Sequence, residues 1–380
     1  MVIEREKGLI PGRSTQAYAI LSLIAVSGEL PVTQIDRLRG GRAYKEKLIK
    51  TLKRNKLIYT YYRDKLRGYR LTDIAKKALL ADNKPRFASF FAGDTETSLP
   101  KYEITRRLRL HSIAEALVTM TNANVRVYND EKTGVFGHGS GGNKLNQPVI
   151  TPAFYHSREI KAIGQESAKI RGGRAVGVML TDKRVYIVFN SGDSSMKWDY
   201  KSEMRMKAVM KTTLCFGGVL SQYQPQSVQA LMLGGDMEQA YRLLTGIGGA
   251  RKNYFMLDGS YEHFPYITND HNGEIVLRLL RDERTRQELN TVLSENLLPR
   301  DARSLIENDA MDPNGGPVLF AYDCDMPRIA RFNVASRIQG SSGTLICFDF
   351  QADTLRRFCG DSIQTRSIDI EKFERRFLCH

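Results

Sequence analysis

The segment RAYKEKLIKTLKRNKLIYTYYRDKLRGYR, residues 42–70, carries the clearest structural pattern in this chain. Its first half predicts a helix, because Leu48 and Leu52 stand one turn apart and a glycine pair precedes the segment. Its second half predicts a β-hairpin, because residues 57–63 are rich in aromatic and β-branched side chains and a charged turn follows them. The segment therefore predicts a basic helix followed directly by a basic two-stranded ribbon.

A basic helix followed by such a ribbon is typical of a winged helix-turn-helix, in which the helix enters the major groove and the ribbon touches the flanking backbone. Tyr44 and Lys47 are expected near base edges, and Lys50 near phosphate. The predicted DNA contacts are Arg42, Tyr44, Lys45, Lys47, Lys50 and Arg54 on the helix, and Arg63, Lys65, Arg67 and Arg70 on the ribbon. The alternative is a solvated, lysine-rich helix face, which is the usual meaning of a run of like charges.

The positive charge of the chain is concentrated near its amino terminus. Lys and Arg total 57 against 42 Asp and Glu in 380 residues, which gives a net charge of +15. Residues 1–86 contain 20 basic and 8 acidic side chains, so they carry +12 of that charge. This concentration predicts a module that binds a polyanion.

Residues 1–83 have the helix pattern that a winged helix-turn-helix domain requires. Helices are predicted after Ser14 or Thr15, over residues 33–38 and over residues 42–54, and Thr72 is positioned to cap another helix after the ribbon. Residues 84–102 have weak periodicity and predict a linker.

Residues 103–215 and 216–380 are predicted to form two further regions. Residues 103–122 predict a helix, and Arg106, Arg107 and Arg109 crowd its first turns, where they would extend the DNA surface or form a solvated face. Strand-like and helix-like segments then alternate, with one long helix expected over residues 274–293. Alternation of this kind predicts a mixed α/β fold, and residues 216–380 are expected to mediate self-association or partner binding.

One arrangement invites a nuclease interpretation. Residues 175–214 predict a strand, a hairpin turn, a second strand and a helix. Restriction-endonuclease-like folds have this order of elements and carry their metal-binding acids on it. The matching strand positions hold Gly177, Val188 and Asn190 instead of carboxylates and a lysine. The nearby charged residues Asp182, Asp193, Lys197 and Glu203 are predicted to lie in turns or on the following helix. The region is therefore expected to be a degenerate nuclease-like domain without a metal site, with a nuclease that uses the displaced acids as the alternative.

Asp323 and Asp325 follow a predicted strand, where the end of a sheet could hold a ligand. Because Met326 and Pro327 come next, Asp325 is also well placed to cap the next helix, and this structural role is the expected one.

The remaining features predict a cytoplasmic protein. No apolar run approaches the roughly 18 residues that span a bilayer, and the acidic start does not resemble a signal peptide. The 5 cysteines are odd in number and widely spaced, which argues against a disulfide framework or a zinc site.

The winged-helix pattern, the segment RRLRLHSIAEA (106–116) and the block AVGVMLTDKRVYIVFNSGDSSMKWDYKSEM (175–204) together resemble the replication-relaxation family of bacterial plasmids and integrative elements. In that family the later block usually has an aspartate in its first strand and Glu-x-Asp-Arg-Gly-Thr after the second. This chain keeps Gly192 but lacks the acids. The resemblance implies a DNA-binding accessory protein of a plasmid or conjugative mobile element, acting in replication, transfer or their regulation.

The expected protein is thus non-enzymatic and needs no cofactor. Its expected partners are double-stranded DNA and either a second copy or an element-encoded protein, with no membrane. A transcription regulator whose carboxyl-terminal region senses a small ligand remains another alternative.

Overall fold

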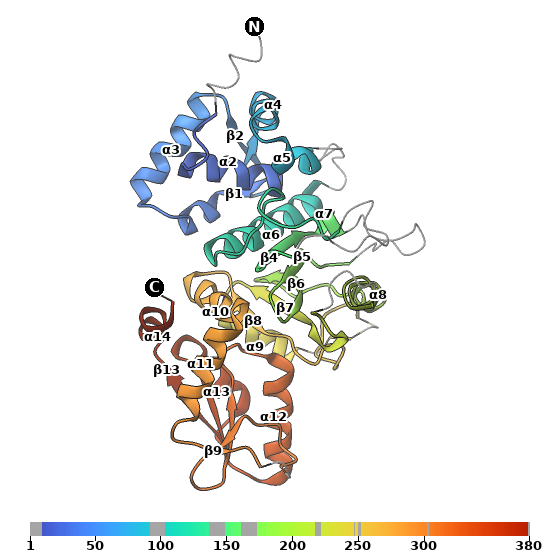
Figure 1. Cartoon of the computed structure of the whole chain (residues 1–380), viewed down its shortest axis with the longest axis vertical. Helices are drawn as coiled ribbons and strands as arrows, with labels where there is room; N and C mark the ends of the chain where they lie inside the picture. The colour runs from blue at the N-terminus through green and yellow to red at the C-terminus, as the bar shows by residue number, and fades with distance from the viewer. Residues whose placement is uncertain are drawn as a thin grey trace. The chain divides into compact units, whose positions relative to one another are not determined.

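The computed structural model describes residues 10–91, 103–136, 149–160, 173–216, 222–246, 248–249, 252–301 and 304–378 (Figure 1). The fold is mixed α/β, with one three-stranded and two five-stranded sheets among these residues. The chain divides into two compact units, which are described separately. Unit 1 comprises Met1–Gly134 and Gln147–Ile150, and unit 2 comprises Val135–Asn146 and Thr151–His380.

Unit 1 begins with three short helical segments and a hairpin. They are α2 (Gln16–Ser27), η1 (Val32–Arg37), α3 (Arg42–Arg54), and the strands β2 (Ile58–Arg63) and β3 (Leu66–Leu71). The two-residue strand β1 (Leu30–Pro31) pairs antiparallel with β3, so the sheet order is β1-β3-β2. Thr15 caps α2 and Thr72 caps α4 (Asp73–Asp82), because each side-chain oxygen accepts a backbone N–H of the first turn.

The predicted linker and the predicted boundary at residue 83 are wrong. Residues 84–91 form α5 (Lys84–Phe91), whose Phe87 and Phe90 are fully buried, while residues 92–102 lie outside the described residues. Helix α6 (Glu103–Asn122) packs on α2 and β1 and belongs to unit 1. The burial of two aromatic rings is enough to hold this short helix in place. So few apolar positions give only weak periodicity, and the sequence therefore did not predict the helix.

The first sheet of unit 2 has the order β4-β5-β6-β7-β8. Its strands are β4 (Ala153–His156), β5 (Gly177–Leu180), β6 (Val185–Gly192), β7 (Val228–Gly234) and β8 (Tyr266–Thr268). The first three strands pair antiparallel, and β7 and β8 continue the sheet in parallel. Along the chain, α7 (Ser157–Ile160) connects β4 to β5, α8 (Tyr200–Met210) follows β6, and α9 (Met237–Thr245) follows β7. The wide helical turn η4 (Lys211–Phe216) extends α8. The predicted hairpin of residues 175–190 is confirmed.

The second sheet of unit 2 has the order β13-β12-β11-β10-β9. Its strands are β9 (Leu298–Pro299), β10 (Ala310–Met311), β11 (Pro317–Phe320), β12 (Gly343–Phe348) and β13 (Ile363–Ile368). Its helices are α12 (Met326–Gln339), α13 (Asp349–Cys359) and α14 (Ile370–Phe377). Figure 1 shows α12 and α13 beside these strands.

Two predictions about unit 2 are wrong. The boundary at residue 215 divides the first sheet, because β7 and β8 pair with β6 and with each other. The single helix expected over residues 274–293 is two helices, α10 (His271–Arg281) and α11 (Glu283–Ser294). Asp282 leaves the helical conformation and its carboxylate accepts the N–H groups of Arg284 and Thr285, which ends one helix and starts the next.

The two sheets of unit 2 are joined through backbone hydrogen bonds. Tyr266 N donates to Cys324 O at 3.1 Å, and Met326 N donates to Phe264 O at 3.2 Å. The strand β8 therefore lies against the segment that follows β11. Within the described residues, Cys215, Cys324, Cys347 and Cys359 are free thiols, and no helix has the length and apolar character needed to cross a membrane.

Candidate functional site

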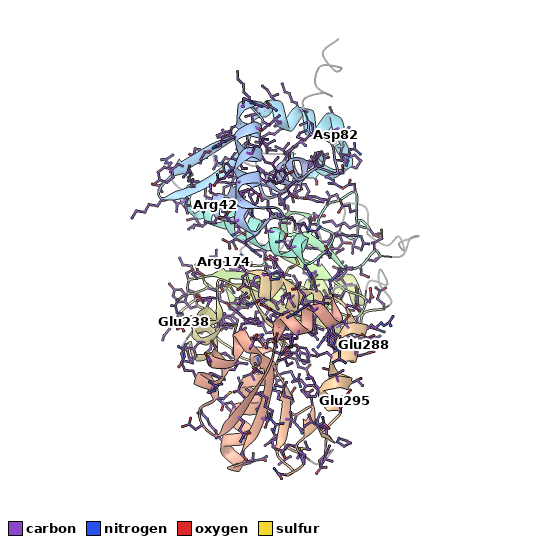
Figure 2. All side chains as sticks on the ribbon, turned by 90° about the vertical axis from the view of Figure 1, so that its left-hand side faces the viewer. Arg42, Asp82, Arg174, Glu238, Glu288 and Glu295 are labelled. Atoms are coloured by element: carbon purple, nitrogen blue, oxygen red, sulfur yellow. The ribbon has the colours of Figure 1, made fainter. Side chains whose placement is uncertain are left out.

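Helix α3 buries one face and exposes a basic one. Leu52 is buried as predicted, whereas Leu48 is only partly covered and Ile49 is buried in its place. Tyr44 is 50% exposed, and Lys47, Lys50 and Arg54 are exposed as well. The predicted exposure of Tyr44, Lys47 and Lys50 is confirmed. Arg42 is exposed at the start of the helix (Figure 2), and its Nε lies 3.1 Å from Glu46 Oε1.

Lys45 does not belong to this exposed face, although the sequence placed it among the DNA contacts. Its side chain is buried, and its Nζ donates to the carbonyl oxygens of Asp36 at 2.8 Å and Leu38 at 3.1 Å. Those carbonyls close the η1 segment, where cations interact favourably with unpaired backbone oxygens. Lys45 therefore holds η1 against α3.

Asp64 and Lys65 form the two-residue turn that joins the strands of the hairpin. Both have left-handed backbone conformations, with φ of 51° and 62°, and Arg63 pairs with Leu66 across the turn. Such a turn matches the twist of a β-hairpin, but it favours glycine or asparagine over residues with longer side chains. Lys65 and Arg67 are exposed, and Arg63 is half exposed while it pairs with Glu103 at 2.5 Å.

We use the name α3–hairpin surface for the exposed members of the predicted set. They are Arg42, Tyr44, Lys47, Lys50 and Arg54 on α3, and Arg63, Lys65 and Arg67 on the hairpin. The two elements adjoin, because Lys53 Nζ lies 5.1 Å from the ring centroid of Tyr69 on β3. Lys53, Lys56 and Tyr62, which is 67% exposed, were not among the predicted contacts. The alternation of β2 would have identified Tyr62, since side chains along a strand point to opposite faces.

Arg70 is the second predicted contact that the structure removes from the surface. It is buried and pairs with the fully buried carboxylate of Glu29 at 2.8 Å. Arg107 of α6, which is also fully buried, pairs with the same carboxylate at 2.6 Å, and His111 Nε2 lies 2.8 Å from it. Neither expectation for Arg107, DNA binding or a solvated face, is correct. We call these four residues the Glu29 cluster.

The Glu29 cluster is tightly packed. A Cβ at Gly68 would collide with the Glu29 side chain, so only glycine fits beside it in β3. Both guanidinium groups lie against the Tyr61 ring, with their Cζ atoms 3.9 Å (Arg70) and 4.6 Å (Arg107) from its centroid. Burial alone would raise the pKa of Glu29, but hydrogen bonds from His111 and Arg107 and the charge of Arg70 lower it to about 2. Glu29 is thus a buried, ionised carboxylate that connects the hairpin to α6.

The structure shows why the strand positions that would carry nuclease acids hold Gly177, Val188 and Asn190 in this chain. Gly177 lies between His156 and Val188 in the sheet, and a Cβ there would collide with the Phe154 ring and the Tyr155 carbonyl. Val188 is fully buried, and the Asn190 carboxamide oxygen accepts Gly192 N at 3.1 Å. An aspartate at position 177 would therefore require the neighbouring strand to move.

The displaced acids are dispersed. Asp182 accepts the Thr151 hydroxyl in the turn, Asp193 is exposed after β6, and Glu203 is fully buried and accepts Arg174 N at 2.6 Å. Lys197 is exposed in the segment between β6 and α8. Within the part of the chain that the structure describes, no three His, Cys, Asp or Glu side chains are grouped closely enough to hold a metal ion.

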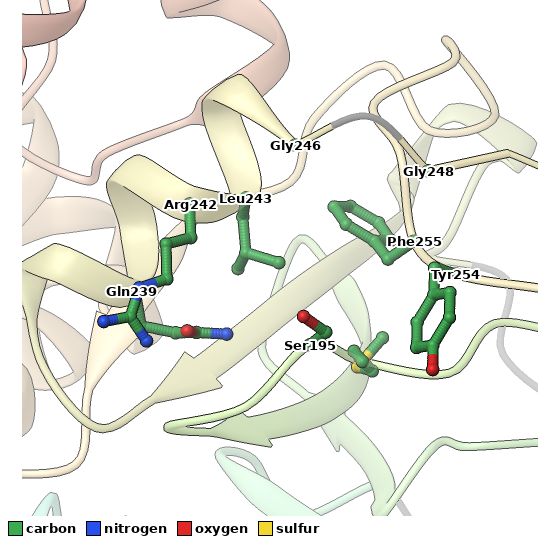
Figure 3. Close-up of a pocket in the computed structure, with 9 residues that line it drawn as sticks. Ser195, Gln239, Arg242, Leu243, Gly246, Gly248, Tyr254 and Phe255 are labelled. Carbon is green, nitrogen blue, oxygen red and sulfur yellow. The ribbon is translucent and has the colours of Figure 1, made fainter.

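A cavity of about 220 Å³ lies beside α9 (Figure 3). Gln239 projects from the helix toward Ser195, Arg242 lies beside it on the same helix, and Tyr254 and Phe255 line the facing segment. The Gln239 carboxamide donates to Ser194 O at 2.9 Å, and Arg242 donates to Asp193 O at 3.4 Å. None of the described lining residues is an acid, histidine or cysteine. Gly246 and Gly248 flank residue 247, which lies outside the described residues.

Comparison with known proteins gives no relative: no family model, no curated protein and no solved structure matches this chain.

Proposed function

We propose that unit 1 is a winged helix-turn-helix module that binds duplex DNA, with α3 as the recognition helix and the β2–β3 hairpin as the wing. The order of elements supports this proposal, since α2, η1 and α3 are followed by a hairpin whose second strand pairs with β1. In such modules the recognition helix enters the major groove and the wing contacts the backbone beside it.

The observation that carries the proposal is the composition of the α3–hairpin surface. Its cations are exposed, and the acids on the same two elements are Glu46 and Asp64. Most of the excess charge of the whole chain lies in this part of the sequence. A surface of this kind attracts phosphate oxygens and releases condensed counterions when it binds DNA.

The function proposed for unit 2 is non-enzymatic. The proposal keeps the interpretation of β5, β6 and α8 as a degenerate restriction-endonuclease-like core, and the order β5-β6 followed by α8 supports it. The crowded Gly177 and the dispersed acids give the nuclease alternative no support in the described residues. The resemblance to the replication-relaxation family would assign the DNA binding to a plasmid or conjugative element.

Fluorescence anisotropy of the full-length chain on labelled duplexes at several salt concentrations tests the proposal. Arg67→Ala should weaken binding to all sequences alike and lower the log–log salt slope by about 1, because one phosphate contact is lost. Lys47→Ala should cost about 1–3 kcal/mol on a site enriched from random DNA and less on unselected DNA. The difference between the two variants separates base recognition from phosphate contact.

Lys77→Ala is the matched control, since Lys77 is an exposed lysine on α4 of the same unit. It should leave both the affinity and the salt slope nearly unchanged. If Lys77→Ala weakens binding as much as Arg67→Ala, only the total charge matters and the assignment of the α3–hairpin surface is wrong.

A further inference from the structure

A second cavity of about 220 Å³ lies in unit 2 where the two sheets meet. Tyr186 near the start of β6 and Gln229 near the start of β7 form one side of it. Arg286 of α11 and the acidic segment that follows β11 form the other side. Its lining is almost entirely polar, and Tyr186, Asp323 and Asp325 in it are buried.

Several hydrogen-bond donors in this cavity lack acceptors. Tyr186 is fully buried, and its hydroxyl donates to no acceptor in the described residues. The Nε and Nη1 atoms of Arg286 are buried without a hydrogen-bond partner in the same part of the structure. The Arg184 guanidinium lies beside the Tyr186 hydroxyl and donates toward it, so the proton of that hydroxyl still lacks an acceptor in the described residues. Buried polar groups are rarely left in this state unless a ligand or water completes them.

The carboxylates that approach these donors do not satisfy them. Arg286 Nη2 lies 3.7 Å from Asp323 and Nη1 lies 3.8 Å from Glu283, distances beyond hydrogen bonding. Arg184 lies 3.4 Å from Glu283. The guanidinium groups of Arg184 and Arg286 therefore make only weak contacts with these carboxylates. Their N–H donors can still bind another oxyanion.

The other acids of the cavity already have close partners. Arg328 binds Glu307 at 2.8 Å and Asp309 at 2.9 Å. Asp325, expected to cap α12, instead accepts His263 Nδ1 at 2.7 Å and Phe264 N at 3.0 Å, and makes no side-chain capping bond. Arg331 also binds Glu307 at 2.9 Å, so these three acids are offset by close cationic partners or hydrogen-bond donors. The donors of Arg184, Tyr186 and Arg286 are the polar groups of the cavity that remain without close acceptors among the described residues.

We propose that this cavity binds a small oxyanion, the phosphate or carboxylate group of a small molecule, through Arg184, Tyr186 and Arg286. The site is independent of the DNA-binding surface of unit 1. Asp323 limits the affinity, because its buried carboxyl group faces Arg286 and would repel the bound anion. Burial and the neighbouring Asp325 raise the pKa of Asp323, because the cations around it, Arg286 included, do not fully offset the cost of burying its charge.

The test is thermal unfolding and calorimetric titration of the full-length protein with sodium phosphate and with sodium succinate, each against sodium chloride at equal ionic strength. Saturable binding of either anion is expected, and the anion that binds more tightly identifies the ligand as a phosphate or a carboxylate compound. Tyr186→Phe should weaken binding about tenfold and Arg286→Gln more than tenfold, because each removes donors to a charged acceptor. Asp323→Asn should tighten binding.

Arg356→Gln is the matched control, since Arg356 is exposed on α13 and pairs only with the exposed Asp353 among the described ion partners. It should leave anion binding unchanged. Tyr186→Phe also guards against misfolding, because it keeps the buried ring and removes only a hydroxyl that donates to no described residue, so the unfolding temperature should change little. No saturable binding of either anion, or equal binding by wild type, Tyr186→Phe and Arg286→Gln, would overturn the proposal.

Discussion

Glu29 has no exposed surface and binds two guanidinium groups through short hydrogen bonds. A buried ion pair adds little stability compared with apolar packing, but removing one partner leaves the other charges buried without compensation. The two arginines depend on this one carboxylate because the remaining bonds of Arg107 go to neutral backbone oxygens, such as Leu66 O at 3.0 Å.

Glu29→Gln should therefore lower the free energy of unfolding by about 3–5 kcal/mol. Urea denaturation at neutral pH measures the change. Glu46→Gln is the control, since Glu46 forms an exposed pair with Arg42 and its loss should cost no more than about 0.5 kcal/mol. Equal stability of the two variants would contradict the structural role of the Glu29 cluster.

The same carboxylate contributes a defined pH dependence. Its pKa in the folded chain, about 2, is below its ordinary value of 4.5, so its contribution is fully present above pH 4.5. That contribution should be lost as the pH falls from 4.5 toward 2. In Glu29→Gln this part of the acid destabilisation should be absent.

At the scale of elements, the hairpin turn holds a lysine in a conformation that suits glycine. Lys65 has a φ of 62°, which costs a residue with a Cβ about 1 kcal/mol relative to glycine. Lys65→Gly should therefore raise the free energy of unfolding by about that amount, as urea denaturation would show. The same substitution should weaken DNA binding, because it removes a cation from the proposed wing.

Lys65→Ala separates the two effects. It removes the charge but keeps a Cβ, so it should weaken DNA binding as much as Lys65→Gly without raising stability. If Lys65→Gly leaves DNA affinity unchanged, the tip of the hairpin is not part of the interface.

Local signals in the sequence predicted α3 and the hairpin correctly, because apolar spacing and turn residues lie within a few positions of each other. They could not identify Lys45, Arg70 or Arg107 as buried. The partners of Arg70 and Arg107 lie 41 and 78 residues away in the chain, and basic side chains look alike in a sequence whether they face solvent or a buried acid. The break at Asp282 was missed because apolar positions continue on both sides of it.

At the scale of the molecule, α6 supplies part of the core of unit 1. It packs on α2, and its Arg107 completes the Glu29 cluster. A fragment of residues 10–91 retains the whole α3–hairpin surface but leaves Glu29 and Arg70 without Arg107. We expect this fragment to unfold at a lower temperature than a fragment of residues 10–134, or to lack a cooperative transition, when both are followed by circular dichroism.

Equal cooperative transitions in the two fragments would contradict this expectation. A fragment of residues 10–134 that folds and binds duplex DNA would also supply the isolated module for mapping the α3–hairpin surface by chemical-shift perturbation.

The position of Glu29 also has a consequence for strand alignment. The hairpin strands IYTYYR and LRGYRL repeat tyrosine and arginine, so side-chain chemistry alone distinguishes poorly between one pairing and a pairing shifted by one residue. A shift of one residue along β3 would point Arg70 to the opposite face and bring a side chain to the place where only Gly68 fits. Contacts with Glu29 therefore favour one register of β3, because only Gly68 fits against its side chain and only Arg70 pairs with its carboxylate from that strand.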